Sequence, residues 1–276
     1  YQDPSLFGQA IFFQTGRTDV PEPMNLANDL ASIFKKDGAM GKKGKKIVWA
    51  DEFDYVGEPD QTRWAYDAPD SGKYNQELQL YTDSRNNSFV KDGVLTISAL
   101  KDAAGKWTSA RLYTKGKADW TYGYFEVRAK LPAGKGTWPA IWMMPARDAY
   151  GDWPASGEID IMEFVGFEPD KIHTSVHTKS FNHRIQTQKT RNAFVNGVTA
   201  DFHTYAMEWN EKGIFWYVDD KPFYSFLNTG KGSAEWPFDK SFFLILNVAM
   251  GGSWGGMNGM DASLKKADMV VDYVRV

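Results

Sequence analysis

The chain has 276 residues, of which 42% are hydrophobic and 24% are charged, and its formal net charge is −3. This balance argues against nucleic-acid binding, because no surplus of Lys and Arg is available to neutralise phosphates. The sequence has no apolar run of about 18 residues and no Cys, which excludes an ordinary membrane-spanning helix and any disulfide or thiolate chemistry.

Residues 1–46 differ in pattern from the rest of the chain. Apolar side chains spaced at i, i+4, i+7 and i+8 predict one short amphipathic helix, and these are Leu26, Leu30, Ile33 and Phe34. The run KKDGAMGKKGKK at 35–46 follows, and such a charge run is typical of a solvated linker. We therefore expect an N-terminal extension with a short helix and a basic linker over 1–46, and one further domain over 47–276, which the motifs below predict to be catalytic.

From residue 47 onward the hydrophobic pattern is mostly that of β-strands. Residues 94–98 and 125–131 alternate polar and apolar side chains, and turn-forming pairs such as Asp219-Asp220 separate the runs. The strand-like runs are 47–53, 76–82, 94–100, 109–115, 122–131, 139–144, 157–164, 172–178, 203–210, 213–218, 221–226, 242–249 and 268–276. Many short strands that do not alternate with helices predict an all-β antiparallel sandwich or barrel.

The segment SGEIDIMEFVG, residues 156–166, carries three acids within one strand-like run. Side chains on a strand alternate between faces, so Glu158 and Asp160 share one face. Strict alternation would turn Glu163 to the opposite face. A one-residue bulge at about Ile161–Met162 would return Glu163 to the acidic face, and bulges are frequent beside active sites.

Three carboxyls on one half-buried face repel each other, so at least one of their pKa values should rise. Glycoside hydrolysis uses such a difference, because one carboxylate attacks the anomeric carbon while a protonated carboxyl assists the leaving group. Retention of configuration needs these two groups about 5–5.5 Å apart. A curved strand would let the outer side chains converge on a sugar between them.

The same acidic pattern could also be a solvent-exposed acidic strand or a calcium site. The surrounding aromatic residues favour the catalytic interpretation. Aromatic residues make up 15% of the chain, including 11 Trp, and the stretch GTWPAIWMMP at 136–145 comes shortly before the acids. Trp153 lies five residues before Glu158. Sugar rings stack well on flat aromatic side chains, so this composition favours a carbohydrate substrate.

The segment GEIDIMEFVG resembles the catalytic signature of glycoside hydrolase family 16 in its laminarinase-like, bulged form E-x-D-x-x-E. The resemblance covers residues 47–276 and leaves 1–46 outside. Further segments that are similar to bacterial β-1,3-glucanases are WADEFDY (49–55), NQELQLYT (75–82), TYGYFEVRAKLPAGKGTWPAIWMMP (121–145), FHTYAMEWN (202–210), FLILNVAMGGSWGG (243–256) and VDYVRV (271–276). The resemblance implies a concanavalin-like β-jelly-roll sandwich of two curved antiparallel sheets with a concave substrate cleft.

The resemblance also implies roles for the three acids. Glu158 would be the nucleophile that forms a glycosyl-enzyme. Glu163 would be the general acid and then the base that activates water. Asp160, between them, would hydrogen-bond the nucleophile and modulate both pKa values. No cofactor takes part in that chemistry.

Substrate contacts are implied at seven further positions. These are Asn75, Arg111, Trp138, Trp142, Trp153, His177 and Trp254. For each Trp a core role is the alternative, since Trp is usually buried. For His177 the alternative is a position behind the acids without direct substrate contact.

Members of this family often carry a structural calcium ion on the convex side. The implied set in this sequence is Asp272 together with backbone oxygens near Glu52 and Gly93. Calcium prefers such oxygen ligands. The alternative is that Asp272 only caps the last strand.

We therefore expect a retaining endo-hydrolase of β-1,3-linked, laminarin-type glucan, which would bind a β-glucan polysaccharide or oligosaccharide. The alternatives are a mixed-linkage β-1,3-1,4-glucanase and a non-catalytic, lectin-like glucan-binding module. The intact acid triplet favours an enzyme, because a binding module has no need for three mutually repelling carboxylates. We expect a monomer that is secreted, periplasmic or at the cell surface of a bacterium, with a trimmed start and no visible anchor.

Overall fold

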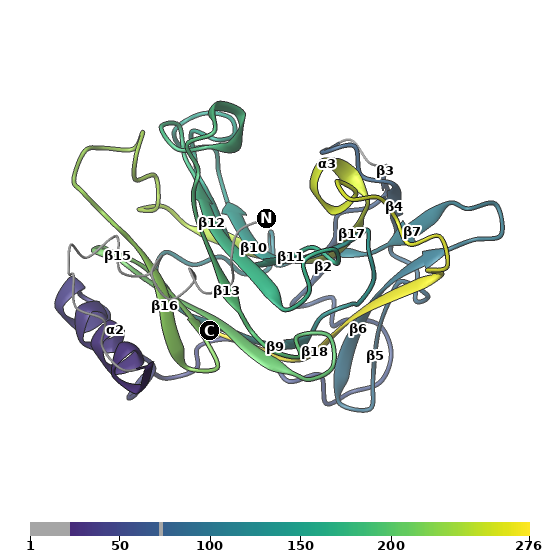
Figure 1. The fold of residues 1–276 in the computed structure, drawn as a ribbon, viewed down its shortest axis with the longest axis horizontal. Helices are drawn as coiled ribbons and strands as arrows, with labels where there is room; N and C mark the ends of the chain where they lie inside the picture. The colour runs from purple at the N-terminus through teal and green to yellow at the C-terminus, as the bar shows by residue number, and fades with distance from the viewer. Residues whose placement is uncertain (1–22, 72–73) are drawn as a thin grey trace.

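The alternating apolar strands form two β-sheets in the computed structural model, which describes residues 23–71 and 74–276 (Figure 1). Among these residues the larger sheet has 11 strands. Their order is β16 (Lys221–Leu227), β15 (Gly213–Val218), β14 (His203–Asn210), β9 (Gly123–Lys130), β18 (Lys266–Arg275), β6 (Val94–Lys101), β7 (Trp107–Ser109), β4 (Gln79–Tyr81) and β3 (Asp70–Ser71), with β1 (Ala50–Asp51) beside β18 and β5 (Ser88–Lys91) beside β6. All pairs are antiparallel except β4 with β7.

The smaller sheet has seven strands in the described residues. Their order is β13 (Lys189–Phe194), β12 (Lys171–His177), β11 (Glu158–Phe164), β10 (Thr137–Pro145), β17 (Phe242–Met250), β8 (Arg111–Tyr113) and β2 (Ala65–Tyr66). The core lies between the two sheets and takes side chains from both, such as Leu95 and Val127 from one and Ile159 and Leu246 from the other. The predicted two-sheet antiparallel sandwich is therefore confirmed.

Each of the thirteen predicted runs contains a strand, although in the first run only Ala50–Asp51 pairs with a neighbour. Strands β2, β3, β5, β7 and β13 were not predicted. Four of them have only two to four residues, which is too short for a clear alternation. The fifth, β13, lies at the sheet edge and has the polar sequence KTRNAF, so it carries no run of apolar residues.

The predicted helix is present as α2 (Pro23–Asp37), and it lies against the outer face of the larger sheet (Figure 1). Phe34 is buried there, with its ring centroid 5.3 Å from that of Phe215 and 5.7 Å from that of Tyr217. The described residues also form two short helices, η3 (His183–Ile185) and α3 (Gly252–Gly255). In the described parts of the chain no helix is both long and apolar enough to cross a membrane.

The basic run after α2 was expected to be a solvated linker, but part of it is attached to the sheet. Two buried glutamates on neighbouring strands hold it. The Glu208 carboxylate accepts hydrogen bonds from the backbone N–H groups of Met40 and Gly41 and from Lys45 at 3.2 Å. Lys42 forms an ion pair with Glu126 at 2.5 Å. The expectation failed because the partners lie more than 80 residues away in the sequence. The boundary after residue 46 stays a prediction.

Candidate active site

Strand β11 carries the three acids, and its pairing with both neighbours contains a bulge. Asp160 lies opposite Ser175 of β12 and Glu163 lies opposite His173, so three steps along β11 match two along β12. The pairing with β10 shifts at the same place. The predicted bulge at Ile161–Met162 is therefore confirmed, and it turns Glu163 to the face that Glu158 and Asp160 share.

Asp160 lies in the middle of the row and is the most enclosed of the three, with 2% of its side chain exposed. Its Oδ2 is 3.4 Å from Nε2 of His177. Burial raises the pKa of Asp160 well above its usual value, and the neighbouring charge of Glu158 raises it further. Asp160 thus keeps its proton more readily than an exposed aspartic acid would.

Glu158 lies at one end of the row, opposite His177. The indole N–H of Trp153 donates a hydrogen bond to Oε2 of Glu158 at 2.5 Å. The Trp153 ring is in turn covered by η3, with the His183 ring centroid 4.9 Å and the Arg184 guanidinium 4.5 Å away. The sequence analysis did not predict His183 and Arg184 as site residues, because η3 lies in a polar loop without periodicity.

Glu163 lies at the other end of the row. The indole N–H of Trp138 donates a hydrogen bond to its Oε1 at 3.0 Å. Burial raises the pKa of Glu163 well above its usual value, the charge of Asp160 raises it further, and the bond from Trp138 lowers it. Both outer acids therefore receive an indole N–H, and one of them has the high pKa that a general acid needs.

Trp254 closes the Glu163 end of the row from helix α3. Its ring meets the ring of Trp138 edge to face at 5.5 Å and that of His173 at 4.8 Å. The backbone at the start of α3 also lies close to that of Asn75, which requires Gly252, since it has φ +77° and a Cβ there would lie 2.9 Å from the carbonyl oxygen of Asn75. That carbonyl accepts a hydrogen bond from the first turn of α3, at Ser253. Asn75 thus anchors the loop that carries Trp254.

Arg111 and Trp142 lie on the same face of the smaller sheet as the acids, on strands β8 and β10. Trp142 lies opposite Asp160 in the strand pairing and donates its indole N–H to Asn247 at 2.7 Å. The Arg111 guanidinium lies 6.0 Å from the Trp142 ring centroid and pairs with Asp67. The structure therefore brings Trp138, Trp153, His177 and Trp254 to the acids, and places Arg111 and Trp142 beside them.

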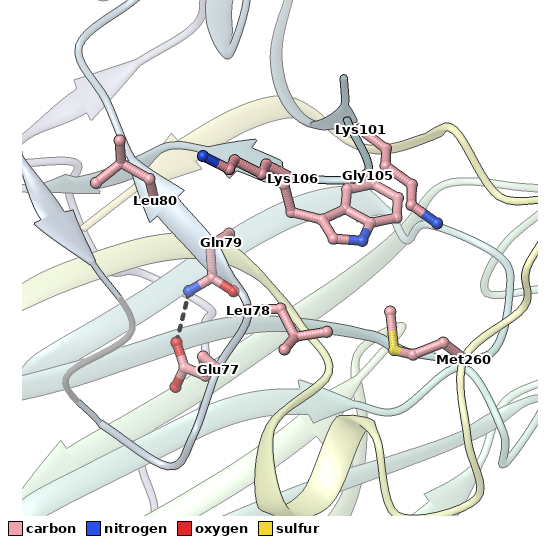
Figure 2. A pocket seen from close by; sticks show the side chains of 9 residues that line it. Glu77, Leu78, Gln79, Leu80, Lys101, Gly105, Lys106 and Met260 are labelled. Atoms are coloured by element: carbon pink, nitrogen blue, oxygen red, sulfur yellow. Dashed lines mark hydrogen bonds between the residues drawn. The ribbon is translucent and has the colours of Figure 1, made fainter. Parts of the chain in front are cut away.

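A cavity of about 500 Å³ lies outside this acidic face (Figure 2). Figure 2 shows the hydrogen bond that the Gln79 side-chain amide donates to the Glu77 carboxylate at the cavity, and the Leu78 and Met260 side chains pointing toward each other. Its lining comes from Glu77, Leu78, Gln79, Leu80, Lys101, Gly105, Lys106, Trp107 and Met260. No residue predicted for catalysis or substrate contact is in this set, so the acid row and not this cavity is the candidate active site.

Of the implied calcium positions, Asp272 lies on β18 of the larger sheet, and Glu52 directly follows β1 of the same sheet. The Glu52 carboxylate accepts two hydrogen bonds from Arg275, both at 2.8 Å, and Asp272 pairs with Arg128 at 2.5 Å. Gly93 lies in the tight turn between β5 and β6. The one side-chain carboxylate of the set, Asp272, is thus engaged by an arginine, and calcium would have to displace Arg128 from it. The calcium site stays a prediction.

An antiparallel sandwich with three carboxyls in a row, two of them with raised pKa values and tryptophans at both ends, defines the class of β-sandwich glycoside hydrolases. The model of glycosyl hydrolases family 16 matches residues 62–275, and the chain belongs to this family.

Similar sequences and solved structures agree with this assignment. The β-glucanase of Rhodothermus marinus is 52% identical over 84% of this chain and 84% of its own length. The structure of the laminarinase from Rhodothermus marinus aligns with a TM-score of 0.81 at 50% identity, covering 83% of this chain and 96% of the other. SCLam, a non-specific endo-β-1,3(4)-glucanase, aligns with a TM-score of 0.80 at 45% identity, covering 85% of this chain and 95% of the other.

Proposed function

We propose that the chain is a retaining endo-hydrolase of β-1,3-linked glucan that works by double displacement. The bulge carries this proposal, because it sets Glu158, Asp160 and Glu163 on one face of β11. Hydrolysis with retention needs one ionised and one protonated carboxyl at the same glycosidic bond. The β-glucanase and laminarinase among the relatives support β-glucan as the substrate.

In the first step the Glu158 carboxylate attacks the anomeric carbon, and the bond from that carbon to the leaving oxygen breaks. The Glu163 carboxyl gives its proton to the leaving oxygen, and its raised pKa suits this task. In the second step the Glu163 carboxylate takes a proton from water. The water oxygen bonds to the anomeric carbon, and Glu158 leaves as a free carboxylate.

Asp160 supports both steps without contacting the leaving group. Its raised pKa favours the protonated form, and it lies within hydrogen-bonding reach of Glu158. A neutral carboxyl can donate a hydrogen bond to the nucleophile and adds no second negative charge beside it. Asp160 would thereby hold the Glu158 carboxylate in position for attack.

Azide can test the two assigned roles separately. In Glu158→Ala, azide would enter from the side that the nucleophile vacated and form an α-glycosyl azide. In Glu163→Ala, azide would attack the glycosyl-enzyme from the opposite side and form a β-glycosyl azide. Glu211→Gln, in the exposed turn between β14 and β15, is the control that should keep normal activity. The opposite pair of azide products would refute the assignment.

Mixed-linkage β-1,3-1,4-glucan is the alternative main substrate, since SCLam is described as acting without strict specificity. Product profiles on laminarin, lichenan and barley β-glucan distinguish the two activities. Failure to cleave any of the three would refute the glucanase proposal. Binding of glucan without any cleavage of the polymer would favour the lectin-like alternative.

We further propose that the chain is a monomer. We also propose that it acts outside the cytoplasm, because a polymeric glucan cannot cross a membrane to reach it. Light scattering of the purified chain tests the first part. Activity in the culture medium, the periplasm or at the surface of intact cells tests the second.

A further inference from the structure

A group of three potential metal ligands lies within the candidate active site. One ligand atom each from Glu158, Asp160 and His177 lies within 4.8 Å of the other two. The two acids come from β11 and the histidine from the paired position of β12, so the group is held by the sheet. The proposed hydrolysis assigns no proton transfer to His177.

One ligand atom of this group, Oδ2 of Asp160, is buried without a hydrogen-bond partner among the described residues. Nδ1 of His177 is also buried without such a partner, but the nitrogen that faces Asp160 is Nε2. The side chains are 2% and 9% exposed, so bulk water reaches them poorly. A buried polar atom without a partner costs stability, and it indicates a missing water or ion.

The spacing suits a small borderline-soft cation. Zinc binds imidazole nitrogen and carboxylate oxygen at about 2.0–2.2 Å, so two of its tetrahedral ligands lie about 3.4 Å apart. Oδ2 of Asp160 and Nε2 of His177 are 3.4 Å apart. Glu158 is only partly buried, and its ligand atom lies within 4.8 Å of the other two, so its side chain would have to turn toward them to complete the set. Calcium and magnesium are less suited, because they prefer six or more oxygen ligands.

We propose that Glu158, Asp160 and His177 form a binding site for Zn²⁺, with water at the fourth position, and that zinc there reversibly blocks hydrolysis. Zinc would displace the proton of Asp160, balance the two carboxylates that result, and give Oδ2 of Asp160 the partner that it lacks. The blocking effect rests on the proposed role of Glu158, because a coordinated carboxylate cannot attack the anomeric carbon. The binding of zinc does not depend on that role.

Calorimetric titration of the untagged chain with zinc chloride tests the binding. We expect one ion per chain, and at least about tenfold weaker binding in His177→Gln. His203→Gln is the matched control, because His203 also pairs with a carboxylate, that of Asp219, but lies on the larger sheet. Equal zinc affinity in His177→Gln and the unmodified chain would overturn the proposal.

Crystals soaked in zinc give a second readout that does not depend on variants folding well. Anomalous scattering at the zinc edge should place one ion within about 2.0–2.2 Å of the three ligand atoms. An ion beside His173 and Glu168 instead, or no ion at this site at millimolar zinc, would also overturn it.

Inhibition of laminarin hydrolysis is measured separately. Zinc should raise the apparent KM without lowering kcat, and a zinc-selective chelator should restore activity with calcium in excess. Inhibition of His177→Gln is measured against the activity of that variant without zinc. The zinc concentration that halves this activity should be at least about tenfold higher than the one that halves the activity of the unmodified chain. Zinc binding without any glucan hydrolysis would refute the proposed function but leave the metal site intact. Hydrolysis that millimolar zinc does not affect would refute the inhibition.

Discussion

The hydrogen bond from Trp138 to Glu163 should set the alkaline limit of activity. The indole N–H lies 3.0 Å from Oε1 of Glu163 and stabilises the ionised form, which lowers the pKa of that carboxyl. Trp138→Phe keeps an aromatic ring against Trp254 but removes the donor. The pKa of Glu163 should therefore rise in this variant.

The size of the shift follows from the energy of the bond. A hydrogen bond to a charged group contributes about 1.5–3 kcal/mol, and about 1.4 kcal/mol corresponds to one pKa unit. Water entering beside the smaller ring would replace part of the lost bond, so we expect a rise of about one unit. A general acid works only while protonated, so activity falls as pH rises through its pKa. The alkaline limb should thus move to higher pH by about one unit.

The assay is the pH dependence of kcat/KM for laminarin, which reports the pKa values of the free enzyme. Trp142→Phe is the matched control, because its indole N–H binds Asn247 and not an acid. That variant should leave the alkaline limb in place. An unchanged or lowered limb in Trp138→Phe, or the same shift in both variants, would refute the role of this bond.

Three further predictions concern stability. Lys45→Met should lower the free energy of unfolding by about 2 kcal/mol in urea titrations, because the buried Glu208 carboxylate loses its cation. No change would mean that the backbone N–H groups alone hold it. If calcium binds, it should raise the Tm of the unmodified chain but not of Asp272→Asn, and equal shifts would place it elsewhere. Gly166→Ala should cost about 3 kcal/mol, since the new Cβ would lie 1.8 Å from the carbonyl oxygen of Gly134, and a stable variant would show that this contact relaxes.

The fold could be predicted from the sequence wherever polar and apolar side chains alternate clearly. The bulge could be predicted because all three acids can share one face of the strand only if it is present. Period-two patterns depend only on neighbouring residues, so runs such as 94–100 and 125–131 are visible without tertiary information. The bulge at Ile161–Met162 was inferred from chemistry, since strict alternation would have separated Glu163 from the other acids.

The contacts that sequence reasoning missed are those between distant segments. Nothing local indicates that Lys42 and Lys45 meet Glu126 and Glu208, because each pair joins the N-terminal segment to a strand far along the chain. Arg184 was missed for a related reason, since it covers the ring of Trp153, which lies in another loop. Charge runs look solvated in a sequence because their partners are unknown.

The apolar residues of β11 require the bulge as much as its acids do. Ile161 and Met162 are adjacent, yet both are buried in the core. Without the bulge Met162 would lie on the acidic face and Glu163 would point between the sheets. Burying Met162 contributes about 1.5–3 kcal/mol, and an unpaired charge in the core would cost several kcal/mol. Packing and chemistry therefore favour the same irregular strand, and the energy of the core holds Glu163 beside the other two acids.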